Sequence, residues 1–279
     1  MRKRRFIQAD VFSSLPARGN GLAVVVDADG LSETDMQRFA AWTNLAETTF
    51  LLPPTDPAAD YRVRIFTPGR EMPFAGHPTL GSCAAWLHCG GVAKDPSRVI
   101  QECGVGLVEI DLTGTVPAFV APPTTIKPLD EAEIIRLAAA LDLPRSVILK
   151  GMELANGPVW QVLELADAHA VLAVDSARVS WPDFVGLSLI GAHPAGLGFD
   201  FEVRMISPSS GMSEDPITGS LNAAIAHWLA KDGRLTKPLV MRQGTCVGRD
   251  GRVFITPDTD NRILIGGAVQ ILIDGWVTL

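Results

Sequence analysis

The sequence predicts a protein of mixed helices and strands, of the α/β (α+β) class, built from two pseudo-symmetric domains. Three observations support this prediction. A chain of 279 residues exceeds the usual size of one core and suits two. The stretch Pro122–Pro128 contains three prolines and forms an extended connector near the middle. The halves on either side of it carry matching motifs, so we expect one domain at 1–120 and another at 121–279, with the last strands returning to the first domain.

Local patterns define the elements of the first half. Ser32, followed three residues later by Asp35, resembles a capping box and predicts a helix from Glu33 to about Thr43. Alternating or continuous apolar runs predict strands at Phe6–Phe12, Leu22–Val26, Thr48–Leu52 and Tyr61–Phe66.

The second half opens with a predicted helix from about Glu131 to Leu141. Strands are predicted at Val159–Leu165, Phe199–Ile206, Pro238–Arg242 and Val253–Thr256. Near the end, Asp274-Gly275 is flanked by apolar runs and predicts a hairpin between Arg262–Ile273 and Trp276–Leu279.

An internal repeat relates the two halves. The segment Gly76–Ser82 aligns with Glu214–Ser220, with Pro, Gly and Ser coinciding, and each runs into an alanine-rich stretch. Upstream, Val63–Pro68 resembles Val203–Pro208. A strand, a Pro-containing loop and a helix therefore occur twice, as in a duplicated domain. The alanines predict that both helices are closely surrounded by strands.

The repeated loop is the best candidate for a binding site. Proline is favoured at the first position of a helix, and Pro78 and Pro216 directly follow His77 and Asp215. We therefore expect His77 and Asp215 to be the N-cap residues of the two helices. A helix start presents free N–H groups and a partial positive charge. If the two starts converge on one cleft, they suit a carboxylate or an enolate-like oxyanion.

Glu47 is the best candidate for an acid/base group. It lies where a helix gives way to the apolar run Phe50–Leu52. Partial desolvation of a carboxyl group at such a junction favours proton transfer near neutral pH.

These motifs resemble those of the PhzF family of phenazine biosynthesis. The resemblance rests on Asn44–Phe50, Arg64–Pro68, Pro73–Thr79 and Glu214–Ser220, which occur in family order across essentially the whole chain. It implies a diaminopimelate-epimerase-like fold, in which each domain is a curled mixed sheet or open barrel around a central helix.

The resemblance also implies a function. Glu47 would move a proton on a small carboxylate substrate, assisted by His77 and Asp215, in an inter-domain cleft. Gly76, Gly219 and Ser220 would surround that substrate. The best-known member isomerises trans-2,3-dihydro-3-hydroxyanthranilate. The resemblance further implies a homodimer with neither cofactor nor metal.

Composition excludes several other classes of protein. The net charge of −7 argues against a nucleic-acid surface, and no apolar run reaches the length of a membrane span. The four cysteines match no zinc pattern or disulfide framework, so we expect them to be packing residues in a cytoplasmic protein. The scattered histidines disfavour a metal site.

Two alternatives to the isomerase stay open on sequence alone. One is an epimerase or racemase of a small amino or hydroxy acid that works without thiols, because no cysteine stands at either helix start. The other is a non-catalytic member of the family that binds a ligand. Pro216 and Asn222 depart from the small residues of the phenazine enzyme, so the substrate stays open as well.

Overall fold

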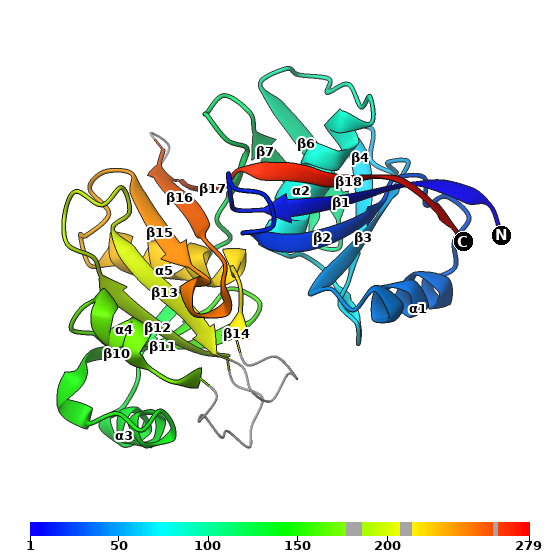
Figure 1. Cartoon of the computed structure of the whole chain (residues 1–279). Helices are drawn as coiled ribbons and strands as arrows, with labels where there is room; N and C mark the ends of the chain where they lie inside the picture. Colours follow the sequence, from blue (N-terminus) through cyan, green and yellow to red (C-terminus); the bar gives the residue numbers. More distant parts are fainter. Residues whose placement is uncertain (177–185, 207–213, 259–261) are drawn as a thin grey trace. The chain divides into compact units, whose positions relative to one another are not determined.

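The computed structural model describes residues 1–176, 186–206, 214–258 and 262–279. The chain divides into two compact units: unit 1 is Met1–Val120 with Gly266–Leu279, and unit 2 is Ala121–Ile265. The C-terminal segment thus belongs to unit 1. There Arg2 and Leu279 exchange backbone hydrogen bonds of 2.6 and 3.1 Å, so the two chain ends lie together (Figure 1).

Unit 1 is a mixed sheet with two helices. Its elements are β1 (Lys3–Val11), β2 (Asn20–Val25), α1 (Glu33–Thr43), β3 (Glu47–Leu52), β4 (Tyr61–Phe66), β5 (Glu71–Met72), α2 (Gly76–His88), β6 (Arg98–Cys103), β7 (Gly106–Asp111), β8 (Ala118–Val120) and β18 (Val269–Thr278). The strands pair in the order β18-β1-β2-β3-β4-β6-β7-β8, with β2/β3 and β4/β6 parallel and the others antiparallel.

Unit 2 has the same kind of sheet. Its elements are β9 (Thr125–Pro128), α3 (Glu131–Ala140), a 3₁₀ turn (Arg145–Val147), β10 (Ile148–Ala155), β11 (Val159–Leu165), α4 (Ala168–Ala173), β12 (Gly186–Ala192), β13 (Phe201–Ile206), β14 (Glu214–Asp215), α5 (Gly219–Lys231), β15 (Leu239–Gln243), a second 3₁₀ turn (Thr245–Val247), β16 (Gly251–Pro257) and β17 (Ile263–Gly266). The pairing order is β9-β10-β11-β12-β13-β15-β16, with β11/β12 and β13/β15 parallel.

The two units repeat one topology. Read from β18 and from β9, the pairings follow the same succession: two antiparallel, one parallel, one antiparallel, one parallel and one antiparallel. In each unit a two-residue strand, β5 or β14, adds to the strand before the helix. The predicted fold class, two pseudo-symmetric α/β domains, is confirmed.

One helix lies at the centre of each unit. Helix α2 packs against β1, β2, β3 and β18, and α5 packs against β10 and β16. Both helices are buried along most of their length, as their alanines and glycines predict. Gly81 shows how close the packing is, because a Cβ there would lie 2.5 Å from Leu22 Cδ2 of β2.

Helix α1 covers the outer face of the unit 1 sheet and has the predicted bounds. The Ser32 side chain accepts a 3.2 Å hydrogen bond from the backbone N–H of Asp35, which satisfies one N–H of the first turn. Asn44 ends the helix in the left-handed conformation, at φ 54°. The apolar face of the helix, with Met36 and Phe39, is buried against the sheet.

The predicted hairpin at Asp274-Gly275 is wrong. Strand β18 runs without a turn from Val269 to Thr278, and both residues pair with β1, opposite Ile7 and Phe6. The Asp274 carboxylate is held by Arg5 and by His88 Nε2, the latter at 2.9 Å. Because β1 offers a continuous partner over its whole length, pairing overrides the local turn preference of Asp-Gly.

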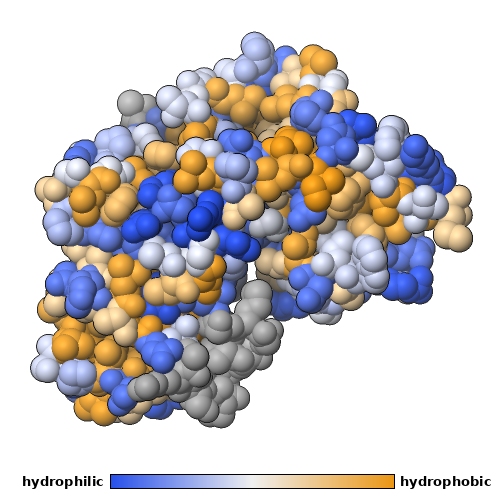
Figure 2. Space-filling view, viewed as in Figure 1, coloured by the Kyte–Doolittle hydropathy of each residue, from blue (hydrophilic) through white to orange (hydrophobic). Residues whose placement is uncertain are grey.

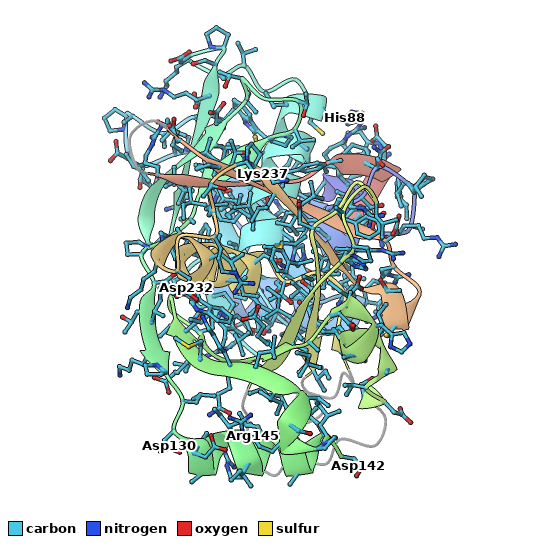
Figure 3. The ribbon with its side chains drawn as sticks, turned by 90° about the vertical axis from the view of Figure 1, so that its left-hand side faces the viewer. His88, Asp130, Asp142, Arg145, Asp232 and Lys237 are labelled. Atoms are coloured by element: carbon cyan, nitrogen blue, oxygen red, sulfur yellow. The ribbon has the colours of Figure 1, made fainter. Side chains whose placement is uncertain are left out.

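The other predicted elements are found within two residues, except that β1 begins at Lys3, three residues before the predicted Phe6, and not all strands were foreseen. Strands β6, β7, β10 and β12 were not predicted, and part of the repeated segment, Ser207-Pro208, lies outside the described residues. Helix α3 begins at its cap Asp130, whose carboxylate accepts a 2.8 Å hydrogen bond from the N–H of Glu133, and Arg145 reaches back to its first turn (Figure 3).

Hydrophilic and hydrophobic residues intermingle on the face of the molecule shown in Figure 2, and neither kind forms a single dominant patch there. None of the helices in the described part of the chain combines the length and apolar character needed to cross a membrane.

Candidate active site

Glu47 lies at the junction where the sequence placed it. It is the first residue of β3 and pairs in register with Leu22 of β2, three residues after the left-handed Asn44 that ends α1. Its side chain is 18% exposed, so the carboxylate is partly withdrawn from water while access to it remains. A proton-transfer group needs both properties.

His77 lies beside Glu47 within unit 1. It is the second residue of α2, its side chain is 6% exposed, and its Nε2 lies 3.3 Å from Oε2 of Glu47. Burial lowers the pKa of His77 to about 3, because desolvation disfavours the imidazolium form. His77 is therefore neutral at physiological pH, with one ring nitrogen able to donate and the other able to accept.

His77 and Asp215 are not N-cap residues, so that prediction is wrong. The N-cap of α2 is Ala75, and the N-cap of α5 is Thr218. Proline tolerates any position of a helical first turn, because none of the N–H groups there has an intrahelical acceptor. Pro78 accordingly sits third in α2, whereas Pro216 precedes α5 altogether.

The repeat itself has a different register from the one that the motifs suggested. In each unit a two-residue strand, a three-residue link and a thirteen-residue helix follow one another, at Glu71–His88 and at Glu214–Lys231. Gly76 therefore corresponds to Gly219. The motif alignment had matched Gly219 with Gly81, five residues further on.

Side-chain contacts support the corrected register. Thr79 and Asn222 occupy equivalent positions, and each donates to the carbonyl of its helix N-cap, both at 2.9 Å. Each also hydrogen-bonds a buried glutamine of a neighbouring strand, Gln101 at 3.1 Å and Gln243 at 2.8 Å.

A repeated ion pair fixes the same register. Arg64 of β4 binds Glu71 of β5, and Arg204 of β13 binds Glu214 of β14. The first pair is partly exposed, at 25% and 37%, whereas the second is buried, at 1% and 0%. In the second pair Arg204 also donates to two backbone carbonyls of the α4 region, at 3.0 and 2.6 Å. Neither arginine was singled out from the sequence, although both lie in the repeated Val-Arg motif.

The corrected register changes which site residues are equivalent. His77 corresponds to Ser220, and Asp215 corresponds to Met72. Gly76-His77 and Gly219-Ser220 are thus the first two residues of their helices. The N–H groups of a helical first turn have no intrahelical acceptor and favour an anion.

Only unit 1 carries an acid at the position of Glu47. Glu47 forms the first pair of the parallel β2/β3 ladder. The corresponding first pair of the β11/β12 ladder in unit 2 contains Gly186 in place of Glu47. The two units therefore share a topology but differ in chemistry.

Asp215 lies in a buried polar network of unit 2. The Thr218 hydroxyl donates to Oδ2 of Asp215, and the Gln243 amide of β15 contacts both residues. Asp215 is 8% exposed, while Gln243 and Asn222 are fully buried. Sequence reasoning missed Thr218 and Gln243. The available signal was a glutamine directly after the predicted strand Pro238–Arg242.

Other candidate groups are separate from Glu47. A hollow of about 300 Å³ in unit 1 is lined by residues of α1, β1 and β18, including Phe39 and Trp42, and Glu47 is not among them. Of the cysteines, Cys83 is the packing residue that the sequence predicts, and burial raises its pKa to about 12, whereas Cys246 is exposed. Within the described ranges, no group of three or more His, Cys, Asp or Glu is arranged to hold a metal ion.

Comparison with known proteins gives matches over the whole chain. A family model described as phenazine biosynthesis-like protein (PhzC-PhzF) matches residues 9–275. Antisense-enhancing sequence 1 of Schizosaccharomyces pombe is 36% identical, covering 99% of both chains. Trans-2,3-dihydro-3-hydroxyanthranilate isomerase of Pseudomonas fluorescens is 32% identical, covering 89% of this chain and 88% of its own. The crystal structure of the Bacillus anthracis phenazine biosynthesis protein of the PhzF family matches 100% of both chains with a TM-score of 0.85 at 23% identity, which shows the same fold.

Proposed function

The chain belongs to the phenazine biosynthesis-like (PhzF) family and is an isomerase, and we propose that it moves a proton on a small carboxylate substrate with Glu47 as the general acid/base. The observation that carries the proposal is the Glu47–His77 pair, a partly shielded carboxylate 3.3 Å from a neutral imidazole. Proton transfer of this kind needs no redox or carrier group, so the proposal includes no cofactor.

The proposed reaction conserves protons and electrons. The Glu47 carboxylate takes a proton from a carbon of the substrate, and the C–H electron pair enters the conjugated system that ends in the substrate carboxylate. Protonated Glu47 then returns a proton to a different carbon, where an electron pair of that system forms the new C–H bond. Glu47 ends as it began, and the substrate has isomerised.

Two features support stabilisation of the intermediate anion. Negative charge that develops on the substrate carboxylate suits N–H groups at a helix start, such as those of Gly76 in α2 and of Gly219 and Ser220 in α5. Neutral His77 adds a hydrogen-bonding group without placing a positive charge beside Glu47. We assign Asp215 to the same reaction as an assisting acid/base group.

The difference between the two units favours an isomerase over a racemase with two equivalent bases. Gly186 stands at the unit 2 position that corresponds to Glu47, so the units do not carry the same acid at that position. One carboxylate that removes a proton and returns it elsewhere is sufficient for isomerisation.

Isotope exchange tests the proposal. The purified protein is incubated in D₂O with trans-2,3-dihydro-3-hydroxyanthranilate, the compound named for the Pseudomonas fluorescens relative, and the products are followed by NMR. We expect deuterium at the carbon that receives the proton. Glu47→Gln should reduce turnover by at least about 10²-fold, the scale of a positioned acid/base group. Glu109→Gln, at a partly exposed glutamate paired with Arg98, is the matched control and should leave turnover unchanged.

Three outcomes would contradict the proposal. Full activity of Glu47→Gln would remove Glu47 from the mechanism. Exchange that inverts a stereocentre without moving a double bond would identify an epimerase, and binding of the substrate with neither exchange nor product would indicate a non-catalytic member.

A further inference from the structure

The amide of Gln243 has only one possible orientation. Its Oε1 accepts the backbone N–H of Thr218 at 3.1 Å, and its Nε2 donates to the backbone carbonyl of Asp215 at 3.2 Å. A backbone N–H can only donate and a backbone carbonyl can only accept, so a flipped amide would lose both bonds. The Nδ2 group of Asn222 donates to the same Oε1 at 2.8 Å and reinforces the orientation.

The orientation of the amide determines the orientation of a hydroxyl group. Nε2 of Gln243 also donates to Oγ1 of Thr218, at 3.0 Å. That contact uses the Thr218 oxygen as an acceptor, so its own proton must point elsewhere. The hydroxyl proton points to Oδ2 of Asp215. A chain of hydrogen bonds with one fixed direction therefore runs from Gln243 through Thr218 to the Asp215 carboxylate.

We propose that Thr218 and Gln243 are positioning residues that keep Oδ2 of Asp215 a permanent acceptor, so that any proton Asp215 carries in the reaction is carried on Oδ1. Protonation of Oδ2 would turn it into a carboxylic hydroxyl oxygen, a poorer acceptor, and would weaken the hydrogen bond from Thr218, whereas protonation of Oδ1 leaves that bond intact. The assignment of Asp215 to the reaction rests on the proposed function. The direction of the hydrogen bonds does not rest on the proposed function, because it follows from the backbone groups of unit 2 alone.

The surroundings of Asp215 favour this fixed arrangement. Gln243 is fully buried, and Thr218 and Asp215 are 7% and 8% exposed, so water competes weakly for these bonds. The neighbouring residue Glu214 points to the opposite face of β14, where Arg204 holds it. The charge of Arg204 is thereby matched by Glu214.

Unit 1 supplies a matched control. Thr79, fully buried in the first turns of α2, accepts a 3.1 Å hydrogen bond from the buried Gln101. Its hydroxyl proton, however, goes to the carbonyl of Ala75 at 2.9 Å. Thr79→Val removes a hydroxyl from a similarly buried threonine that also accepts a hydrogen bond from a glutamine, but whose proton serves the backbone and not a carboxylate.

Kinetics form the first test. Thr218→Val should lower kcat for the exchange reaction about 10-fold or more with little change in KM, because it leaves Oδ2 of Asp215 without its donor. Thr218→Ser retains the hydroxyl and should stay within about 2-fold of the wild-type rate. Wild-type rates in Thr218→Val, or equal losses in Thr218→Val and Thr218→Ser, would overturn the proposal.

A second measurement does not depend on turnover. The Asp215 carboxyl is followed by ¹³C NMR across pH in protein labelled at aspartate, with Asp215→Asn providing the assignment. A lost donor to the charged form moves the titration midpoint to higher pH, by roughly one unit for one such bond. We expect this shift in Thr218→Val, and neither in Thr218→Ser nor in Thr79→Val.

The two measurements separate the two proposals. If the wild-type protein exchanges no proton on any carboxylate tested, the proposed function fails while the NMR titration still decides the direction of the hydrogen bonds. An unchanged titration in a folded Thr218→Val protein, verified by circular dichroism, would overturn the positioning role even if the enzyme is active.

Discussion

Burial of His77 should make the stability of the protein depend on pH in a way that can be measured. Its pKa is lowered from 6.5 to about 3 in the folded chain, because desolvation disfavours the imidazolium. The unfolded chain takes up a proton at His77 below about pH 6.5, while the folded chain stays neutral there until about pH 3. The stabilisation is thus fully present above pH 6.5 and is lost as the pH falls toward 3.

The magnitude follows from this shift. A pH of 5 is about 1.5 units below the pKa of the imidazole in the unfolded chain. Each unit corresponds to about 1.36 kcal/mol, so the free energy of unfolding is about 2 kcal/mol lower at pH 5 than it would be without this proton uptake. At pH 7 the loss is about 0.2 kcal/mol. Replacing His77 by glutamine removes the titrating group together with this loss.

Urea unfolding, followed by circular dichroism at pH 7 and pH 5, tests the prediction. The free energy of unfolding of the wild type, relative to that of His77→Gln, should fall by about 2 kcal/mol between the two pH values. Comparing two pH values cancels any packing cost of the substitution that does not depend on pH. The exposed His169 of α4 provides the control, because His169→Gln should follow the wild type at both values. Parallel curves for wild type and His77→Gln would show that His77 takes up its proton in the folded protein, as an ion pair with Glu47, and would refute the reasoning.

Two further predictions concern a buried ion pair and the packing of α2. Glu214→Gln leaves the buried Arg204 without its counter-charge and should lower the free energy of unfolding by about 3–5 kcal/mol. Glu71→Gln, in the equivalent but partly exposed pair, should lower it by less than about 1 kcal/mol, and equal losses in urea unfolding would contradict the difference in burial. Gly81→Ala places a Cβ 2.5 Å from a leucine carbon of β2 and should cost about 1–3 kcal/mol, whereas Gly69→Ala has open space around it and should shift the melting temperature little. Similar melting temperatures for the two alanine variants would contradict the close packing of α2.

Local patterns in the sequence predicted an element correctly where the residues that stabilise it lie within the element itself. The helix at Glu33–Thr43 was predicted with its observed bounds because its cap and its apolar face lie within the segment itself. Asp274-Gly275 shows the converse. The dipeptide favours a turn, but the partner strand that keeps it extended lies about 270 residues earlier in the chain, and no local pattern reports that pairing.

The register of the repeat could not be read from residue identities alone. Aligning Glu214–Ser220 with Gly76–Ser82 matches Pro, Gly and Ser, while aligning it with Glu71–His77 matches Glu, Pro and Gly. The two alignments have equal numbers of identities, so similarity does not choose between them. The repeated ion pair does. Arg64 and Arg204 each bind a glutamate on the next strand, and only the second alignment matches these two glutamates with one another.

The corrected register also clarifies why Glu47, His77 and Asp215 are different kinds of group. In a duplicated fold with two equivalent bases, the same position in each unit would carry the chemistry, and the enzyme could take a proton from one face and return one to the other. Here Glu47 corresponds to Gly186, and Asp215 corresponds to Met72. Both units have the repeated ion pair and the helix starts, while the groups that we propose as acids and bases differ between them. An enzyme with one shielded carboxylate beside a neutral imidazole is suited to moving a single proton from one atom to another, which is the reaction of an isomerase.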